Sequence, residues 1–168
     1  MSAPGKTVRV RDIMTTDVIT LIAGTSVEDA ARSLTFHHVS GAPVLEHGRI
    51  VGVVTKSDLV DPRYRSSEAR TLAVRDAMTK AVRAVRPGDP VMMAVRLMVD
   101  ESVHRVVVVD DKGKLAGIVS SMDVLLALAR GDRVQEHDAI FEDRQERHGE
   151  PATLTFVDLS LYEVNEGA

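Results

Sequence analysis

The chain has 168 residues, 44% of them hydrophobic and 27% charged, which is typical of a globular protein with one substantial core or two small ones. Its net charge of −4 argues against a nucleic-acid-binding protein, because such proteins neutralise phosphates with a basic surface. The sequence has no cysteine, which excludes disulfides, thiol nucleophiles and thiolate metal sites. It shows no apolar run near the ~18 residues of a membrane span and no signal peptide, so we expect a cytoplasmic protein without a membrane partner.

The sequence contains one internal repeat. Residues 10–15 (VRDIMT) return as residues 74–79 (VRDAMT), a shift of 74 − 10 = 64. The shift becomes 117 − 52 = 65 at Gly52 and Gly117, because the second copy has one more residue in the loop between. A match that survives an insertion in a turn indicates two copies of one structural unit.

These patterns predict four segments along the chain. We expect a first motif over residues 1–60, a polar linker over 61–73, a second motif over 74–130, and a charged extension over 131–168. We interpret the basic cluster of the linker region as solvated; it consists of Arg63, Arg65, Arg70 and Arg75.

Each copy opens with a short turn and a brief strand, near residues 18–21 and 82–85, before its first helix. In the first copy Thr25 and Ser26 are suited to cap this helix, whereas in the second Asp89 is the expected cap and Pro90 the first helical residue. The apolar positions then recur at helical spacing. They are Val27, Ala30, Ala31 and Leu34 in the first copy and Val91, Ala94, Val95 and Met98 in the second.

Two strands around a tight turn follow in each copy. They are expected over residues 43–46 and 49–54 in the first copy, and over 106–110 and 114–119 in the second. The run 106–109 consists of four valines without alternation, which indicates a strand covered on both faces.

The last strand of each copy runs into a second helix at residues 52–58 (GVVTKSD) and 117–123 (GIVSSMD). Unpaired N–H groups at a helix start attract phosphates, and an aspartate beside them can accept hydrogen bonds from sugar hydroxyls. The same residues, Thr55 with Asp58 and Ser120 with Asp123, also fit a helix capping box that needs no ligand. We expect these helices to begin near Ser57 and Met122, and the later one is apolar around much of its circumference, which suggests a partner surface.

Together these elements predict an α/β (α+β) protein with two βαββα units paired about a pseudo-twofold axis, plus a C-terminal strand. That strand, within residues 154–161, must join a sheet because an isolated strand is unstable. It either contacts another subunit or partner, or folds back on its own chain.

In order and spacing, the repeated opening, the SGAPV of residues 40–44, the HRVVVVD of 104–110 and the two strand-to-helix junctions resemble a cystathionine-β-synthase (CBS) domain pair, or Bateman module. The resemblance covers residues 8–130. It implies binding of AMP, ADP, ATP or S-adenosylmethionine in two crevices, with no catalytic cofactor.

Carried over residue by residue, the resemblance makes Asp58 and Asp123 acceptors for ribose hydroxyls and places Thr55 and Ser120 at ribose or phosphate. It assigns phosphate contact to His104 and Arg105, and an arginine suits bidentate oxyanion binding on chemical grounds as well. Contacts to the adenine would come from the short strands and the next strand's start. These candidates are Val18, Ile19, Val82 and Arg83, with Ala42 or Pro43 nearby.

The chain also departs from the pattern of the family. Relatives often have an arginine beside the junction aspartate, where this chain has Ser57 and Met122; Lys56 could replace that charge in the first copy only. The two crevices should therefore differ in affinity.

The remaining signals are structural. No histidine pair lies at helical spacing with a third ligand, and no nucleophile motif is present, so we expect neither a metal site nor an enzyme. We therefore expect a regulatory module that binds an adenosine-containing ligand, is a homodimer and acts on an unidentified protein. The alternative is a ligand-free scaffold that acts through dimerisation and its C-terminal tail.

Overall fold

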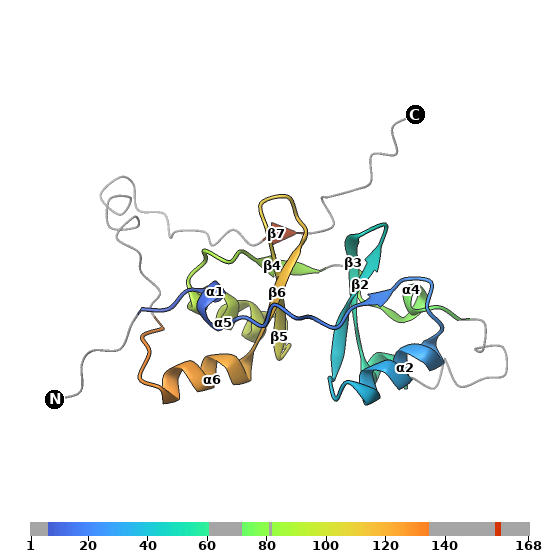
Figure 1. Cartoon of the computed structure of the whole chain (residues 1–168), viewed down its shortest axis with the longest axis horizontal. Coiled ribbons are helices and arrows are strands. Elements are labelled where there is room, and N and C mark those ends of the chain that lie inside the picture. The colour runs from blue at the N-terminus through green and yellow to red at the C-terminus, as the bar shows by residue number, and fades with distance from the viewer. Residues whose placement is uncertain (1–6, 61–71, 81, 135–156, 159–168) are drawn as a thin grey trace. The chain divides into compact units, whose positions relative to one another are not determined.

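The computed structural model describes residues 7–60, 72–80, 82–134 and 157–158. It is a mixed α/β protein that divides into two compact units, each built around one sheet (Figure 1). The first-sheet unit consists of Asp17–Val82, Lys112–Leu115 and Asp158–Ala168, and the second-sheet unit of Met1–Thr16, Arg83–Asp111 and Ala116–Val157. The boundaries of these units differ from those of the two sequence repeats.

The first-sheet unit contains three strands in the order β1-β2-β3. Strand β1 (Leu21–Ile22) is parallel to β2 (Gly41–Glu46), which is antiparallel to β3 (Arg49–Thr55). The β2–β3 turn places both central residues at positive φ, 49° at His47 and 77° at Gly48, which matches the right-handed twist of a hairpin.

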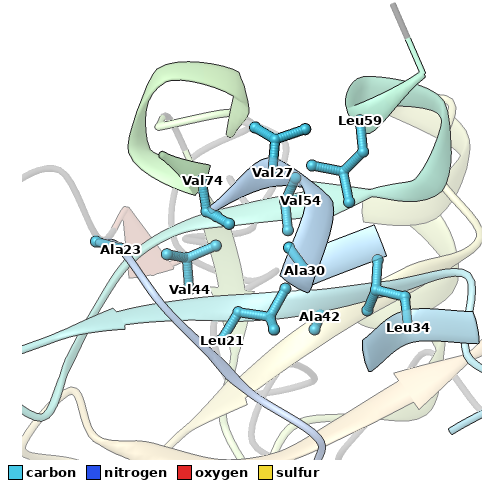
Figure 2. Packing of buried hydrophobic residues seen from close by; sticks show 10 residues of the cluster. All are labelled: Leu21, Ala23, Val27, Ala30, Leu34, Ala42, Val44, Val54, Leu59 and Val74. Carbon is cyan, nitrogen blue, oxygen red and sulfur yellow. The ribbon is translucent and has the colours of Figure 1, made fainter. Parts of the chain in front are cut away.

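Three helices complete this unit: α2 (Val27–Phe36), α3 (Lys56–Leu59) and α4 (Val74–Ala77). Ser26 caps α2, as expected, by accepting a hydrogen bond from the Asp29 backbone N–H at 3.1 Å. The apolar stripe of α2 packs on β2 and β3, and Figure 2 shows the resulting core. The core consists of Leu21, Ala23, Val27, Ala30, Leu34, Ala42, Val44, Val54, Leu59 and Val74.

The second-sheet unit has the strand order β6-β5-β4-β7. The elements in and around this sheet are α1 (Val10–Ile13), β4 (Arg83–Val85), α5 (Val91–Asp100), β5 (Arg105–Val109), β6 (Leu115–Ser120), α6 (Ser121–Ala129) and β7 (Val157–Asp158). Two of their terminal residues, Leu115 and Asp158, are grouped with the first-sheet unit. All four valines of the run 106–109 are buried, which confirms the prediction of a strand covered on both faces. Val106 and Val108 belong to a core cluster with α5 and with Val10 of α1.

The opening segments of the two repeats are exchanged between the sheets. Thr15 of the first repeat exchanges backbone hydrogen bonds with Ile118 of β6, at 2.9 Å in both directions. Thr79 of the second repeat does the same with Val53 of β3, at 3.0 and 2.9 Å. Each sheet is therefore completed by a segment from the other copy.

The starts of β1 and α5 depart from the sequence prediction. Val18 and Ile19 lie before β1, not in it, because Thr15 is bound to β6 and the chain uses the following residues to reach the edge of β2. Asp89 does not cap α5. Its carboxylate accepts a hydrogen bond from the Arg86 backbone N–H at 2.7 Å, and Pro90 is the N-cap residue.

The C-terminal extension contributes one described element. Residues 157–158 form β7, which lies beside β4 in the sheet. The rest of the strand predicted within 154–161, and most of the linker predicted over 61–73, lie outside the described residues. Helix α6 leaves four large apolar side chains exposed, namely Met122, Leu125, Leu126 and Leu128, at 59%, 56%, 46% and 50% of their surface.

Candidate functional site

The first candidate half-site lies where β3 runs into α3. One carboxylate oxygen of Asp58, Oδ2, accepts hydrogen bonds from the Thr55 backbone N–H and from the Thr55 hydroxyl, both at 2.7 Å. The Asp58 backbone N–H donates in return to Thr55 Oγ1 at 3.3 Å. Thr55 and Asp58 are half-buried, so the pair is held in place and still reaches the surface.

The second candidate half-site, where β6 runs into α6, has the same geometry. Asp123 Oδ2 accepts from the Ser120 backbone N–H at 2.7 Å and from the Ser120 hydroxyl at 2.6 Å. The Asp123 backbone N–H donates to Ser120 Oγ at 3.3 Å. The two copies therefore repeat one arrangement with threonine replaced by serine.

Both junctions form complete capping boxes, so this interpretation of the motif is confirmed. A capping box and a ligand do not compete for the same atom here. In each carboxylate the hydrogen bonds to described residues use Oδ2, which leaves Oδ1 as the acceptor that a sugar hydroxyl could reach. The sequence placed these residues together correctly, because a capping box is a local contact across three residues.

Around the first junction, sheet pairing brings further candidates to the same end of the sheet. Residues 41, 42 and 43 of β2 pair with 55, 54 and 53 of β3, so the start of β2 lies beside the end of β3. Ala42 and Pro43 are buried, and Ala42 belongs to the core. The Lys56 backbone N–H donates to Ser40 O at 2.8 Å, which fixes the first residue of α3 against the approach to β2. Val18 and Ile19 are half-buried in the segment that leads to β1.

The second junction has charged neighbours that the first lacks. His104 is exposed, and its backbone O accepts from the Ser121 N–H at 2.9 Å, which is the counterpart of the Lys56–Ser40 contact. Arg105 follows as the half-buried first residue of β5. Arg83, the first residue of β4, forms an ion pair with Glu101 at 2.9 Å, and Val82 is buried. Arg105 thus begins β5, which lies next to β6, the strand that ends at Ser120.

Sequence reasoning missed the residues that cross the two junction strands. A Cβ atom added to Gly52 would lie 2.8 Å from Thr79 O and 2.5 Å from the sulfur of Met78. One added to Gly117 would lie 2.8 Å from Thr15 O and 3.0 Å from the sulfur of Met14. The signal was a glycine inside each strand pattern, which indicates the close approach of another backbone. The motif glycine is therefore required by chain packing.

Within the described ranges, no group of three or more His, Asp or Glu side chains is placed to hold a metal ion. No helix in the same ranges is long and apolar enough to span a bilayer.

Comparison with known proteins gives consistent matches. The family model of the CBS domain matches residues 10–62 and 74–130. An inosine-5'-monophosphate dehydrogenase of Korarchaeum cryptofilum is 34% identical over 116 residues, which are 69% of this chain and 23% of that protein. A homoserine O-acetyltransferase of Methanohalophilus mahii is 30% identical over 125 residues, 74% of this chain and 25% of that protein. The chain thus spans about a quarter of the length of these curated relatives.

Two solved structures of CBS domain pairs match over nearly their whole length. CBSX2, a protein of Arabidopsis thaliana solved in complex with AMP, is 32% identical with a TM-score of 0.65, over 73% of this chain and 96% of that one. The CBS domain pair of MJ0100, in complex with 5-methylthioadenosine and S-adenosyl-L-methionine, is 27% identical with a TM-score of 0.65, over 73% and 97%.

Proposed function

Since the chain belongs to the CBS domain family, with two tandem CBS motifs, we propose that it is a regulatory module that binds an adenosine-containing ligand. The observation that carries the proposal is the duplicated strand-to-helix junction, where a half-buried aspartate faces a helix start with one carboxylate oxygen outside the capping box. The complexes of two similar CBS pairs with AMP and with S-adenosyl-L-methionine support this ligand class.

In the proposed complex Asp58 and Asp123 accept hydrogen bonds from ribose hydroxyls through Oδ1. Thr55 and Ser120 contact the ribose or phosphate at the start of α3 and α6. Val18, Ile19, Val82 and Arg83 contact the adenine, near Ala42 and Pro43. These roles are proposals carried over from the family.

The two half-sites differ in charge, which predicts different ligand preferences. The first offers Lys56 at the helix start, whereas the second offers His104 and Arg105 on the neighbouring strand. An arginine binds a phosphate in a fixed bidentate geometry and a lysine acts as a mobile point charge. We therefore expect the second half-site to prefer AMP, ADP or ATP over S-adenosylmethionine more strongly than the first.

The module has no chemistry of its own in this proposal. A ligand that binds one state of the module better than another shifts the population towards that state, and a partner protein senses the change. The available coupling is about 1–3 kcal/mol. The exposed apolar face of α6 is proposed to pack on its counterpart in a second copy, giving a homodimer closed by twofold symmetry.

A second candidate function is favoured by the same α6 face, because four exposed apolar side chains indicate a protein interface whether or not a ligand binds. In that case the chain is a ligand-free scaffold that acts through dimerisation and its tail. The two functions differ in one measurable property, which is ligand-induced stabilisation.

The test is an unfolding panel with AMP, ATP, S-adenosylmethionine and NADH. A ligand at a hundredfold its dissociation constant should add about 2.7 kcal/mol to the free energy of unfolding. The double variant Asp58→Ala/Asp123→Ala should abolish that increase. Both substitutions also remove a cap, at about 1 kcal/mol each, so the ligand-induced increase is the quantity to compare.

Asp29→Ala is the matched control. Asp29 occupies the equivalent third position of α2, where the Ser26 hydroxyl donates to its Oδ2 at 2.7 Å and its own backbone N–H donates to Ser26 Oγ at 3.1 Å, but it does not lie in the helix that follows β3 or β6. It should lower the baseline stability and keep the full ligand response. A panel in which no compound stabilises the wild-type chain would favour the scaffold, and an unchanged response in the double variant would refute the site.

A further inference from the structure

Short segments of chain connect each candidate half-site to the strand of the other. Thr15 is bound to Ile118 of β6 through two backbone hydrogen bonds, and three residues later the chain reaches Val18, a candidate adenine contact of the first half-site. Thr79 is bound to Val53 of β3 in the same way, three residues before Val82, a candidate contact of the second half-site. Three residues of extended chain span at most about 11 Å.

The bridged strands are also the strands that end in the capping boxes. Ile118 lies two residues before Ser120, and Val53 lies two residues before Thr55. In the first half-site, Val18 follows the Thr15–Ile118 bridge to β6, and Thr55 ends β3, which holds the other bridge. In the second half-site, Val82 follows the Thr79–Val53 bridge to β3, and Ser120 ends β6. The unit boundaries at Thr16 and Asp17, and at Val82 and Arg83, fall within or beside these connections.

We propose that the Thr15–Ile118 and Thr79–Val53 bridges couple the two half-sites, so that ligand bound at one raises the affinity of the other. This inference rests on the proposed function. A ligand that contacts Val18 and Ile19 restricts the short connection to Thr15, which reduces the entropy that is lost when Thr15 pairs with β6. The better-ordered β6 in turn holds Ser120 and Asp123 for the second ligand, and the coupling is reciprocal by linkage.

Glycine at the crossing points allows one bridge to be loosened by a single methyl group. An alanine at 117 would place its Cβ 2.8 Å from Thr15 O, a backbone atom that moves only if the bridge opens. Gly88, in the same unit, is the matched control, because its added Cβ would meet only Arg11 Nη1, at 3.8 Å. Both variants add one methyl group. In Gly117→Ala it clashes with the Thr15–Ile118 bridge, whereas in Gly88→Ala it does not.

The experiment measures AMP affinity by calorimetry in the full-length Asp123→Ala chain, where only the first half-site remains. Adding Gly117→Ala should weaken AMP binding there by about fivefold or more, although residue 117 lies on the strand of the other half-site. Adding Gly88→Ala should leave the affinity within twofold. The mirror experiment uses Asp58→Ala with Gly52→Ala and reports on the second half-site.

An unchanged AMP affinity in the Asp123→Ala/Gly117→Ala chain would overturn the coupling and leave the proposed function intact. If the wild-type chain binds none of AMP, ATP, S-adenosylmethionine or NADH, the proposed function fails and the coupling fails with it. Should Gly117→Ala not fold, hydrogen exchange decides the matter in the Asp123→Ala chain alone. AMP must then slow exchange of the amides at residues 116–119, and unaltered exchange there would contradict the inference.

Discussion

His38 and Ser102 have φ angles of 55° and 54°, in the left-handed region that favours glycine. They occupy the same place in the two repeats, since 102 − 38 = 64, and each follows the end of a helix, α2 or α5. The next residue closes the helix end, with the Val39 N–H donating to Leu34 O at 3.0 Å and the Val103 N–H to Met98 O at 2.9 Å. This is a Schellman-type end with a non-glycine residue in the strained position.

Replacing either residue by glycine should stabilise the protein. His38→Gly and Ser102→Gly each relieve a left-handed backbone, and we expect about 0.5–1 kcal/mol of added free energy of unfolding in a denaturant titration. His37→Gly is the control, because His37 has φ −83° and gains nothing from glycine. It should lose about 0.5–1 kcal/mol. A loss of stability in both His38→Gly and Ser102→Gly would contradict the argument.

Local contacts were the part of the candidate site that the sequence could predict. The capping boxes at Thr55 and Ser120 follow from a three-residue spacing. Asp89 was predicted wrongly because its carboxylate had two local options, the helix ahead and the turn behind, and it bonds to Arg86 in the turn. Whether Asp58 and Asp123 meet a ligand depends on contacts that no local spacing encodes.

Strands and helices were predictable where the pattern of burial was strong. The strands of the β2–β3 hairpin begin and end within two residues of the prediction, and helix α2 begins directly after the predicted cap Ser26, because turn residues and an apolar stripe mark them. Strand β1 was predicted too early, because Val18 and Ile19 are apolar and half-buried but lie in the connection before the strand. The apolar pattern alone does not distinguish a strand from a half-buried connection.

The position of β7 beside β4 allows a test of the C-terminal strand. The double variant Val157→Pro/Asp158→Pro removes both amides of β7, and one of two successive amides must point to β4. Hydrogen exchange of the β4 amides should then become severalfold faster. If β7 folds back on its own chain, this exchange rate should not depend on protein concentration. The variant Val157→Thr/Asp158→Asn keeps both amides and should exchange like the wild type. Unchanged exchange in the proline variant would contradict the β4–β7 contact.

For the whole molecule, the repeat predicted two similar motifs but not the exchange of their opening segments. Periodicity shows that residues 10–15 and 74–79 are equivalent, and it is silent about which sheet each one joins. That choice depends on contacts between residues far apart in the sequence, such as Thr15 with Ile118.

The exposed face of α6 predicts the behaviour of the proposed dimer. Leu125→Lys places a charge where 56% of a leucine is exposed, and a symmetric interface would carry that change twice. Burial of a leucine contributes about 1.5–3 kcal/mol, so we expect dimerisation to weaken by about a hundredfold or more in light scattering with size exclusion. Thr35→Lys, on the exposed side of α2, adds the same charge and should leave the molar mass measured for the dimer unchanged. A wild-type chain that is monomeric at all concentrations would refute the dimer.

The exchanged openings also set an order of assembly. The Val53–Thr79 bridge closes over 79 − 53 = 26 residues, whereas Thr15 must wait for Ile118, 118 − 15 = 103 residues later. Chain statistics make the longer closure about 1.2 kcal/mol more costly. On the ribosome, Val53 of β3 can pair with Thr79 while β6 is still untranslated. Thr15, although it is synthesised early, can pair only after Ile118 has been made. A chain divided in the linker would yield two fragments, of which the first contains Thr15, the pairing partner of β6, and the second contains Thr79, the pairing partner of β3.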